Sequence, residues 1–164
     1  MRDINLKKLI DNLNKNLDYY ASIPADGEAN FEEAYHQVTK DPDGKVRHLL
    51  DEREYSLSCT KEITDYLDTL SPGKILDFGC GLGWILSYLD EKWDKHGLEV
   101  SQFASSHAGK FGKIFNGFFE SYDEKNFDVI IMNHVIEHVP DPIKTIKKVK
   151  KILNKDGVLI IATP

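Results

Sequence analysis

The sequence predicts an α/β fold in which a doubly wound parallel sheet of five strands follows a helical N-terminal segment. Three observations predict it. From residue 74 onward, short apolar runs alternate with amphipathic stretches, as in sheets covered by helices on both faces. The first apolar run ends at glycines in alternate positions, Gly79, Gly81 and Gly83, which is typical of a tight strand-to-helix loop. The first 70 residues show helical periodicity only.

Residues 1–70 are expected to be a helical segment that covers the sheet and its ligand. Apolar residues spaced by three and four predict a helix over residues 3–20 and a shorter one over 28–38. The sequence Asp-Pro-Asp-Gly at 41–44 predicts a turn, and helical pattern returns from about Val46. The face expected to be buried there comprises Ile63, Tyr66, Leu67 and Leu70.

Residues 71–164 are expected to form the sheet and the helices that cover it. The predicted strands are 74–78, 95–99, 113–116, 127–132 and 157–162, and the predicted helices are 83–91, 101–111 and 141–153. Asp141 and Pro142 predict the start of the last helix, with an N-cap and a proline in the first turn. The lysines of that helix are better explained as a solvated face than as a basic binding patch.

The loop after the first strand indicates which ligand to expect. A dinucleotide fingerprint requires G-x-G-x-x-G, but the third-glycine position here is Trp84, and the pattern is D-x-G-x-G-x-G beginning at Asp77. A carboxylate just before the loop disfavours a phosphate. It suits a cofactor that carries a positive charge and a free amino group.

With its downstream motifs, the chain resembles the class I S-adenosylmethionine-dependent methyltransferases. The resemblance covers residues 74–164 and rests on the segments 74–86, 97–101, 126–142 and 153–164. It implies a Rossmann-like sheet with strand order 3-2-1-4-5. It also implies methyl transfer from S-adenosylmethionine, which leaves S-adenosylhomocysteine, to an O, N or C centre of a small molecule such as a quinone, a sugar or another metabolite.

The resemblance assigns cofactor-binding roles to residues at successive strand ends. Asp77 would hold the ammonium group, Glu99 would accept hydrogen bonds from the ribose hydroxyls, and Asn133 would contact the methionine moiety. Glu99 is expected to be an exposed strand-end carboxylate that holds little of the core, so that its loss barely changes fold stability. Val100 would pack against the adenine. The remaining residues of the methionine-binding loop are Gly79, Cys80, Gly81 and Gly83.

Three further positions carry weaker assignments. Phe118 stands where relatives often have an Asp that binds the adenine, so Phe118 or Phe119 would stack on the base, although both are equally plausible as core aromatics. His138 is the one residue nominated as a general base, and a structural role for it is at least as well supported. Tyr19 or Tyr20, or a neighbour of these, is expected to close over the cofactor.

Other site chemistries are disfavoured. His134 and His138 fit the zinc motif H-x-x-E-H, but that motif needs a helix where the sequence predicts a strand. No metal site is therefore expected. Cys80 is better explained as a small loop residue than as a nucleophile, because no neighbour is identified that would lower its pKa.

Composition and charge limit the expected partners and the expected cellular location. The net charge of −6 disfavours a nucleic-acid substrate. No apolar run approaches the ~20 residues needed to span a bilayer, and the N-terminus lacks a signal-peptide pattern. Two cysteines, Cys59 and Cys80, make no disulfide framework, so a cytoplasmic location is expected.

The last residue, Pro164, directly follows the fifth predicted strand, whereas the family sheet usually continues into strands 6 and 7. We therefore expect a truncated domain with an exposed apolar edge at Val158–Ala162 that favours self-association. The alternative to an active methyltransferase is a fragment that binds cofactor but is catalytically incomplete. An NAD-dependent oxidoreductase is a more remote alternative, disfavoured by Asp77 and Trp84.

Overall fold

The structure is a computed structural model that describes residues 38–40 and 46–163, with side chains from residue 48 onward. The elements in chain order are β1 (Val38–Lys40), β2 (Val46–His48), η1 (Leu49–Asp51), α4 (Arg53–Cys59), α5 (Lys61–Leu67), β3 (Lys74–Phe78), α6 (Trp84–Tyr88), β4 (Asp94–Glu99), α7 (Gln102–Ala108), β5 (Lys113–Asn116), η2 (Phe119–Ser121), β6 (Phe127–Asn133), η3 (Ile136–His138), α8 (Pro142–Ile152) and β7 (Leu153–Ala162).

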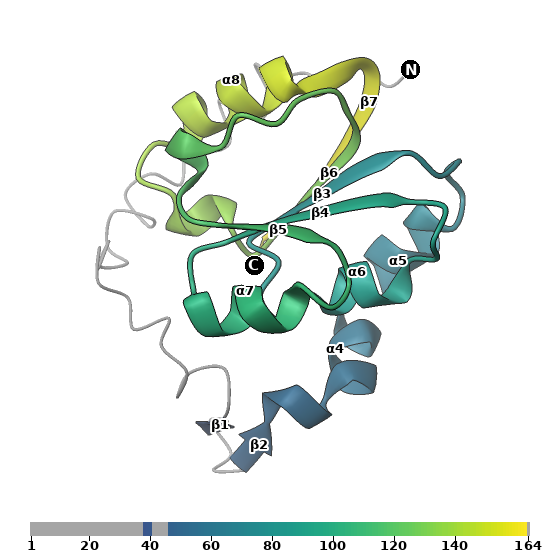
Figure 1. Cartoon of the computed structure of the whole chain (residues 1–164), viewed down its shortest axis with the longest axis vertical. Coiled ribbons are helices and arrows are strands. Elements are labelled where there is room, and N and C mark those ends of the chain that lie inside the picture. The colour runs from purple at the N-terminus through teal and green to yellow at the C-terminus, as the bar shows by residue number, and fades with distance from the viewer. Residues whose placement is uncertain (1–37, 41–45, 164) are drawn as a thin grey trace.

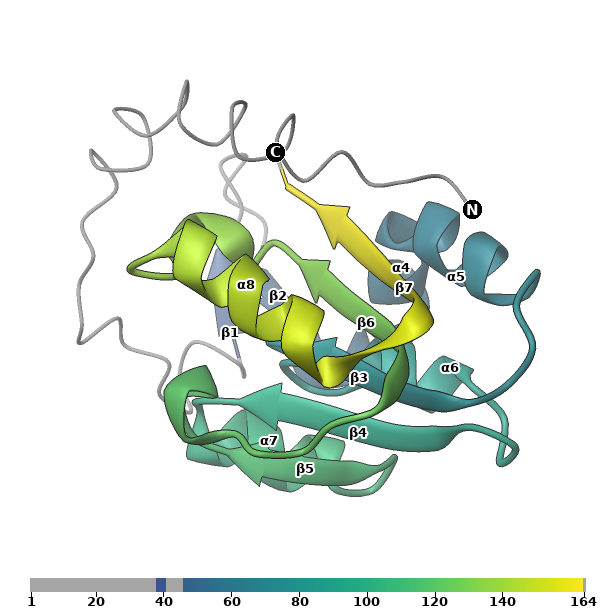
Figure 2. The ribbon, with the colours of Figure 1, turned by 90° about the horizontal axis from the view of Figure 1, so that it is seen from above.

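The main sheet has five parallel strands in the order β5-β4-β3-β6-β7. This is the predicted order 3-2-1-4-5, and the strands lie side by side in Figure 2. The order reverses between β3 and β6, so the carboxyl ends of these two strands flank the crevice where doubly wound sheets bind ligands. The Rossmann-like fold class predicted from the sequence is confirmed.

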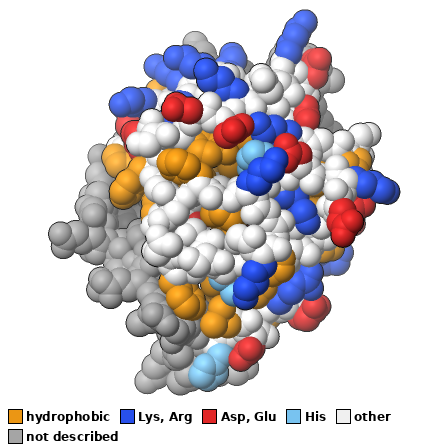
Figure 3. All heavy atoms as spheres, viewed as in Figure 1, with side chains coloured by type: hydrophobic (Ala, Val, Ile, Leu, Met, Phe, Trp, Pro, Cys, Tyr) orange, Lys and Arg blue, Asp and Glu red, His pale blue; other side chains and the backbone are white. Residues whose placement is uncertain are grey.

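Helices cover both faces of the sheet (Figure 1), with α8 on one face and α5, α6 and α7 on the other. On the α8 face, Ile146 and Val149 pack against Leu76 and Ile130 in a large buried cluster. Lys and Arg side chains gather over α8 in Figure 3, while its apolar stripe faces the sheet. Burial of this stripe explains why the lysines form a solvated face.

On the opposite face, α5 and α6 bury their apolar residues against β3 and β6. Ile63 and Leu67 of α5 belong to this cluster. Tyr66 does not, because it lies one position off the i, i+4 stripe and is 46% exposed. The expectation that Tyr66 shares the buried face was wrong.

The helix expected to resume at about Val46 begins later. Val46–His48 instead pairs antiparallel with Val38–Lys40 as a two-stranded sheet, and the first α-helix of the described chain starts at Arg53. This pairing depends on contacts between strands, which helical periodicity cannot reveal. The predicted helix over 3–20, the turn at 41–44 and all but the last residue of the helix over 28–38 lie outside the described residues.

Helix ends follow local chemistry. Asp141 accepts a hydrogen bond from the N–H of Lys144 at 2.9 Å and Pro142 occupies the first turn, as predicted for α8. Ser101 caps α7 in the same way. The last strand is longer than predicted, because α8 ends at Ile152 and β7 follows directly from Leu153, with a register irregularity opposite Phe127 and Val129.

Candidate functional site

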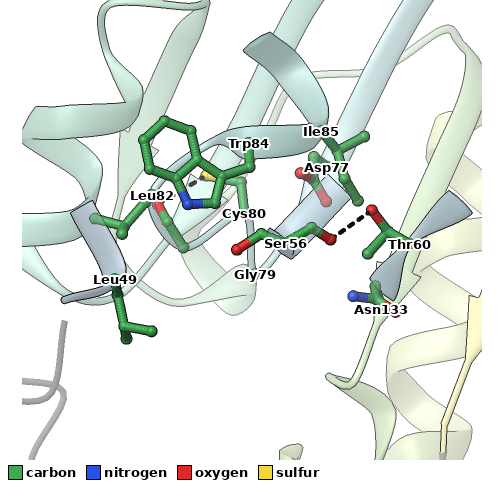
Figure 4. Close-up of a pocket in the computed structure, with 11 residues that line it drawn as sticks. Leu49, Ser56, Thr60, Asp77, Gly79, Cys80, Leu82, Trp84, Ile85 and Asn133 are labelled. Carbon is green, nitrogen blue, oxygen red and sulfur yellow. Dashed lines mark hydrogen bonds between the residues drawn. The ribbon is translucent and has the colours of Figure 1, made fainter. Parts of the chain in front are cut away.

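A pocket of about 380 Å³ opens at the carboxyl ends of β3 and β6, within the ~300–1,000 Å³ range of small-molecule sites. Figure 4 shows side chains from the N-terminal segment, the glycine loop and both strands around it. The lining residues are Leu49, Ser56, Thr60, Asp77, Gly79, Cys80, Gly81, Leu82, Trp84, Ile85 and Asn133. Five of the residues predicted from the sequence therefore meet in one cavity.

Asp77 lies at the end of β3 and is 3% exposed. Within the part of the chain that the structure describes, no hydrogen bond is recorded to its carboxylate. Burial, and second the nearby Glu99 carboxylate, raise the pKa of Asp77 from 3.8 to about 7. Only Asp77 among the lining residues carries an ionisable carboxylate, so a cation would meet this group in the pocket.

The glycine loop brings bare backbone to the pocket. Gly81 has φ +51°, and a Cβ added there would meet nothing within 4 Å, so the space above it is open to a ligand. Gly83 has φ +81°, and a Cβ there would lie 2.9 Å from the Cα of Ala108, so this glycine allows α6 and α7 to approach closely. The loop is tied to β4 because the N–H of Gly79 donates to the carbonyl of Leu98 at 2.8 Å.

Glu99 is part of the framework that holds this loop. Its Oε2 accepts from the N–H of Gly81 and its Oε1 from the N–H of Ser101, both at 2.8 Å. The residue is 6% exposed. The expectation that Glu99 is an exposed strand-end carboxylate with little structural role was wrong, because the sequence does not show that the loop folds back over its side chain.

Asn116 holds the neighbouring backbone. Its side-chain amide donates to the carbonyl oxygens of Glu99 and Val100 at 2.9 and 3.0 Å. Asn116 was not assigned a site role from the sequence, although its place at the end of β5, paired with Glu99, is the signal that would have suggested one.

The Cys80 thiol is not poised for nucleophilic chemistry. Burial, followed by the charges of Asp77 and Glu99, raises its pKa well above the ordinary value of 9.0. A Cβ added at Gly97 would lie 2.7 Å from the Sγ of Cys80, so the thiol is packed closely against β4. This environment agrees with the prediction that Cys80 is a small loop residue.

The N-terminal segment supplies one wall of the pocket through Ser56, which lies on α4, and Thr60, the residue directly after α4. Arg53, at the start of α4, donates to the hydroxyl and the carbonyl oxygen of Ser87 at 2.8 and 3.1 Å. This pair of hydrogen bonds fastens α4 to the end of α6. Ser56, Thr60 and Trp84 are lining residues to which the sequence assigned no role in the site.

Two aromatic candidates separate clearly. Phe119 is 6% exposed and its ring lies 4.6 Å from that of Phe78 in the core, so its packing supports the core alternative. Phe118 is 67% exposed at the end of β5. Neither residue lines the pocket, and neither does Val100. Tyr19 and Tyr20 lie outside the described residues.

The loop after β6 carries the two histidines of the H-x-x-E-H pattern. His134 has φ +53° and follows a strand, and His138 ends the single 3-10 turn η3. The pattern therefore does not lie on the helix that the zinc motif requires. His138 is exposed, and its N–H donates to the carbonyl of Val135 at 2.9 Å. Among the described residues, no group of three or more His, Cys, Asp or Glu side chains is placed to hold a metal ion.

Two solved structures share this fold. The plantazolicin methyltransferase BpumL in complex with SAH aligns with a TM-score of 0.58 at 18% identity, covering 95% of this chain and 61% of that one. A SAM-dependent methyltransferase from Archaeoglobus fulgidus aligns with a TM-score of 0.57 at 19% identity, covering 71% and 57%. At this level of identity the likeness concerns the fold.

Sequence relatives are more similar. A phosphoethanolamine N-methyltransferase of Triticum aestivum is 34% identical over 120 residues, which cover 65% of this chain and 23% of that protein. A ubiquinone biosynthesis O-methyltransferase of Haemophilus ducreyi is 31% identical over 149 residues, which cover 75% and 57%. The chain thus spans between about a quarter and three-fifths of the length of these relatives.

No helix within the described ranges is long and apolar enough to cross a membrane.

The model of the family described as "Methyltransferase domain" matches residues 50–164. That range contains the glycine loop, Glu99, the loop after β6 and every described pocket residue except Leu49. The match extends over more than half of the sequence, and the chain therefore belongs to the methyltransferase domain family.

Proposed function

We propose that this protein binds S-adenosylmethionine in the pocket at the ends of β3 and β6 and transfers its methyl group to a small-molecule acceptor. S-adenosylhomocysteine is then the product. Membership of the methyltransferase domain family supports the reaction, and structural relatives in complex with SAH or SAM support the cofactor.

The observation that carries the proposal is the Asp77 carboxylate. It is buried, faces the pocket and has no hydrogen-bond partner recorded among the described residues. Burying a carboxylate is costly unless it is paired. The α-ammonium group of the cofactor supplies the missing partner, and the open space above Gly81 leaves room for the adjoining methionine chain.

The other proposed contacts involve Glu99, Asn133 and Phe118, and of these only Asn133 lines the pocket. Each Glu99 oxygen already accepts one backbone N–H, but a carboxylate can accept about four hydrogen bonds. It therefore keeps capacity for the two ribose hydroxyls. Asn133, which also lines the pocket, contacts the methionine moiety, and exposed Phe118 is the better placed of the two aromatics to reach the adenine.

The reaction is a direct displacement at the sulfonium methyl. The acceptor lone pair forms the new bond as the carbon–sulfur bond breaks and its electron pair returns to sulfur. Positioning of the two reactants in line provides most of such catalysis. No covalent enzyme intermediate is needed, which agrees with the raised pKa of the Cys80 thiol.

The acceptor is proposed to be a small molecule, as the names of the relatives suggest for those proteins. None of the described residues that line the pocket is Lys or Arg, which favours a neutral hydroxyl-bearing acceptor over a phosphorylated one. A cytoplasmic location and self-association through the apolar β7 edge are part of the same proposal. The location is supported by the free thiols of Cys59 and Cys80, as expected in a reducing compartment, and the self-association by the half-buried residues of β7.

Calorimetry with S-adenosylhomocysteine and, separately, NADH tests the cofactor. The chain has two tryptophans, and Trp84 lines the pocket whereas Trp93 is buried in the core. In a Trp93→Phe variant, S-adenosylhomocysteine should change the fluorescence of Trp84. Binding of NADH without binding of S-adenosylhomocysteine would refute the proposal and support the oxidoreductase alternative.

Transfer itself is measured with S-adenosylmethionine carrying a labelled methyl group, using a phenol and phosphoethanolamine as acceptor probes. Label in the phenol supports the proposed acceptor class. Binding of cofactor without transfer to a broad set of hydroxyl, amine and carbon acceptors would support the alternative of a catalytically incomplete fragment.

A further inference from the structure

The loop after β6 holds a histidine in a strained conformation. His134 has φ +53°, a value that is uncommon for residues other than glycine and is often found at functional sites. Its N–H donates to the carbonyl of Ala162 at 2.8 Å, which ties the loop to the end of β7. The preceding residue, Asn133, lines the pocket. His134 therefore directly follows a residue of the proposed cofactor site.

Glu137 lies against the ring of His134. Its Oε1 is 3.5 Å from His134 Nδ1, and the side chain is only 5% exposed. Its Oε2 is buried and, among the described residues, has no hydrogen-bond partner. A buried carboxylate is costly unless a positive or donating group compensates it. The imidazole N–H, or the imidazolium formed during a reaction, supplies that compensation.

The His134 side chain itself is 59% exposed. One edge of the ring thus faces a buried carboxylate, and the rest of the ring is exposed. A carboxylate that orients a histidine so that the other ring nitrogen faces the substrate is a recurring arrangement for general bases. Distances in such pairs are often long before substrate binds.

We propose that His134 is the general base of the methyl transfer and that Glu137 is its positioning residue; this rests on the proposed function. The acceptor is a hydroxyl. Its proton passes to His134 Nε2, its oxygen bonds to the methyl carbon, and the carbon–sulfur bond breaks with its electron pair going to sulfur. Glu137 holds the Nδ1–H tautomer and stabilises the imidazolium. The proton then leaves to solvent.

This assignment replaces His138, the base nominated from the sequence. His138 is also exposed, but no carboxylate is recorded against its ring among the described residues. Besides Glu137, the titratable side chains near this end of the sheet are Asp77 on β3, His138 on η3 and Asp141 before α8. Those of Lys74, Asp128, Lys155 and Asp156 lie toward the amino ends of β3, β6 and β7. His138 therefore provides a matched control for a histidine on the same loop.

The kinetic test compares His134→Gln, Glu137→Gln and His138→Gln with two phenols as methyl acceptors. One is unsubstituted and protonated at pH 8, and the other is nitro-substituted and already ionised. His134→Gln should lower kcat for the protonated phenol by about 100-fold or more and leave the ionised phenol nearly unaffected. Glu137→Gln should show the same selectivity with a smaller loss, and His138→Gln should change neither. Affinity for S-adenosylhomocysteine should remain that of the wild type.

Equal losses for both phenols, or wild-type kcat in His134→Gln, would overturn the assignment. An independent readout uses the ¹⁵N shifts of the His134 ring, which should report the Nδ1–H tautomer in the wild type and a mixture in Glu137→Gln. If the wild type transfers methyl to neither phenol, the ¹⁵N spectrum alone tests the pairing of His134 with Glu137. The same tautomer in the wild type and in Glu137→Gln would then overturn that pairing. A wild type that fails to bind S-adenosylhomocysteine would instead refute the proposed function.

Discussion

Replacing Asp77 by Asn should make the protein more stable and less able to bind its cofactor. Burial and the neighbouring Glu99 carboxylate raise the pKa of Asp77 from 3.8 to about 7. Because the folded-state pKa lies above that of the unfolded chain, the folded state favours the protonated acid. This stabilising contribution is complete below pH 3.8 and is lost as the pH rises to about 7.

The size of the effect follows from the shift. A difference of about three units corresponds to about 4 kcal/mol at 1.36 kcal/mol per unit, and the part that develops between pH 5 and pH 8 is about 3 kcal/mol. Asn has nearly the shape of the protonated acid and does not ionise. The free energy of unfolding of Asp77→Asn relative to wild type should therefore grow by about 3 kcal/mol between pH 5 and pH 8.

Urea denaturation of both proteins at pH 5, 6, 7 and 8 measures this difference. The same series by calorimetry with S-adenosylhomocysteine should show wild-type affinity rising with pH through about 7, as Asp77 ionises to pair with the ammonium group. Affinity of the variant should be roughly 10–100-fold lower at pH 8, the scale of a hydrogen bond to a charged group. A stability difference that does not vary with pH would refute the reasoning.

Four further substitutions test the site. Gly81→Ala should cost only about 1–2 kcal/mol of stability, because alanine is strained in the left-handed conformation. It should nevertheless weaken S-adenosylhomocysteine binding, because its Cβ enters the open pocket. The matched variant Gly83→Ala should be less stable in urea than Gly81→Ala, since its Cβ meets the backbone of α7. Glu99→Ala should weaken cofactor binding by about 1.5–3 kcal/mol. It should also lower the free energy of unfolding by a similar amount, because the N–H groups of Gly81 and Ser101 lose their acceptor. Unchanged stability in urea would contradict the role of Glu99 in the loop. Arg53→Ala should release α4 from α6 and reduce cofactor affinity in calorimetry with a loss of about 1 kcal/mol in stability, and an affinity equal to that of wild type would show that α4 is held by other contacts.

The sequence by itself determined the fold and five of the eleven residues that line the pocket. Alternating strand and helix patterns suffice for a doubly wound sheet, because chain connectivity and right-handed crossovers leave few arrangements of the strands. The carboxyl ends of parallel strands meet at one edge, so Asp77 and Asn133 could be placed near each other from strand assignment alone. The glycines at positions 79, 81 and 83 indicated a loop open to ligand, because a residue without a Cβ leaves its backbone accessible.

Only the tertiary structure decided what each side chain faces. Glu99 was expected to be exposed, but the glycine loop folds over its side chain and buries it. Phe118 and Phe119 are adjacent in the chain, yet the first is exposed and the second is buried. The tertiary structure also turned Val46–His48 into a strand and brought Glu137 against His134 through a left-handed residue. These features arise from contacts between distant segments and from backbone conformations that local propensity does not encode, so hydrophobic periodicity carries no signal for them.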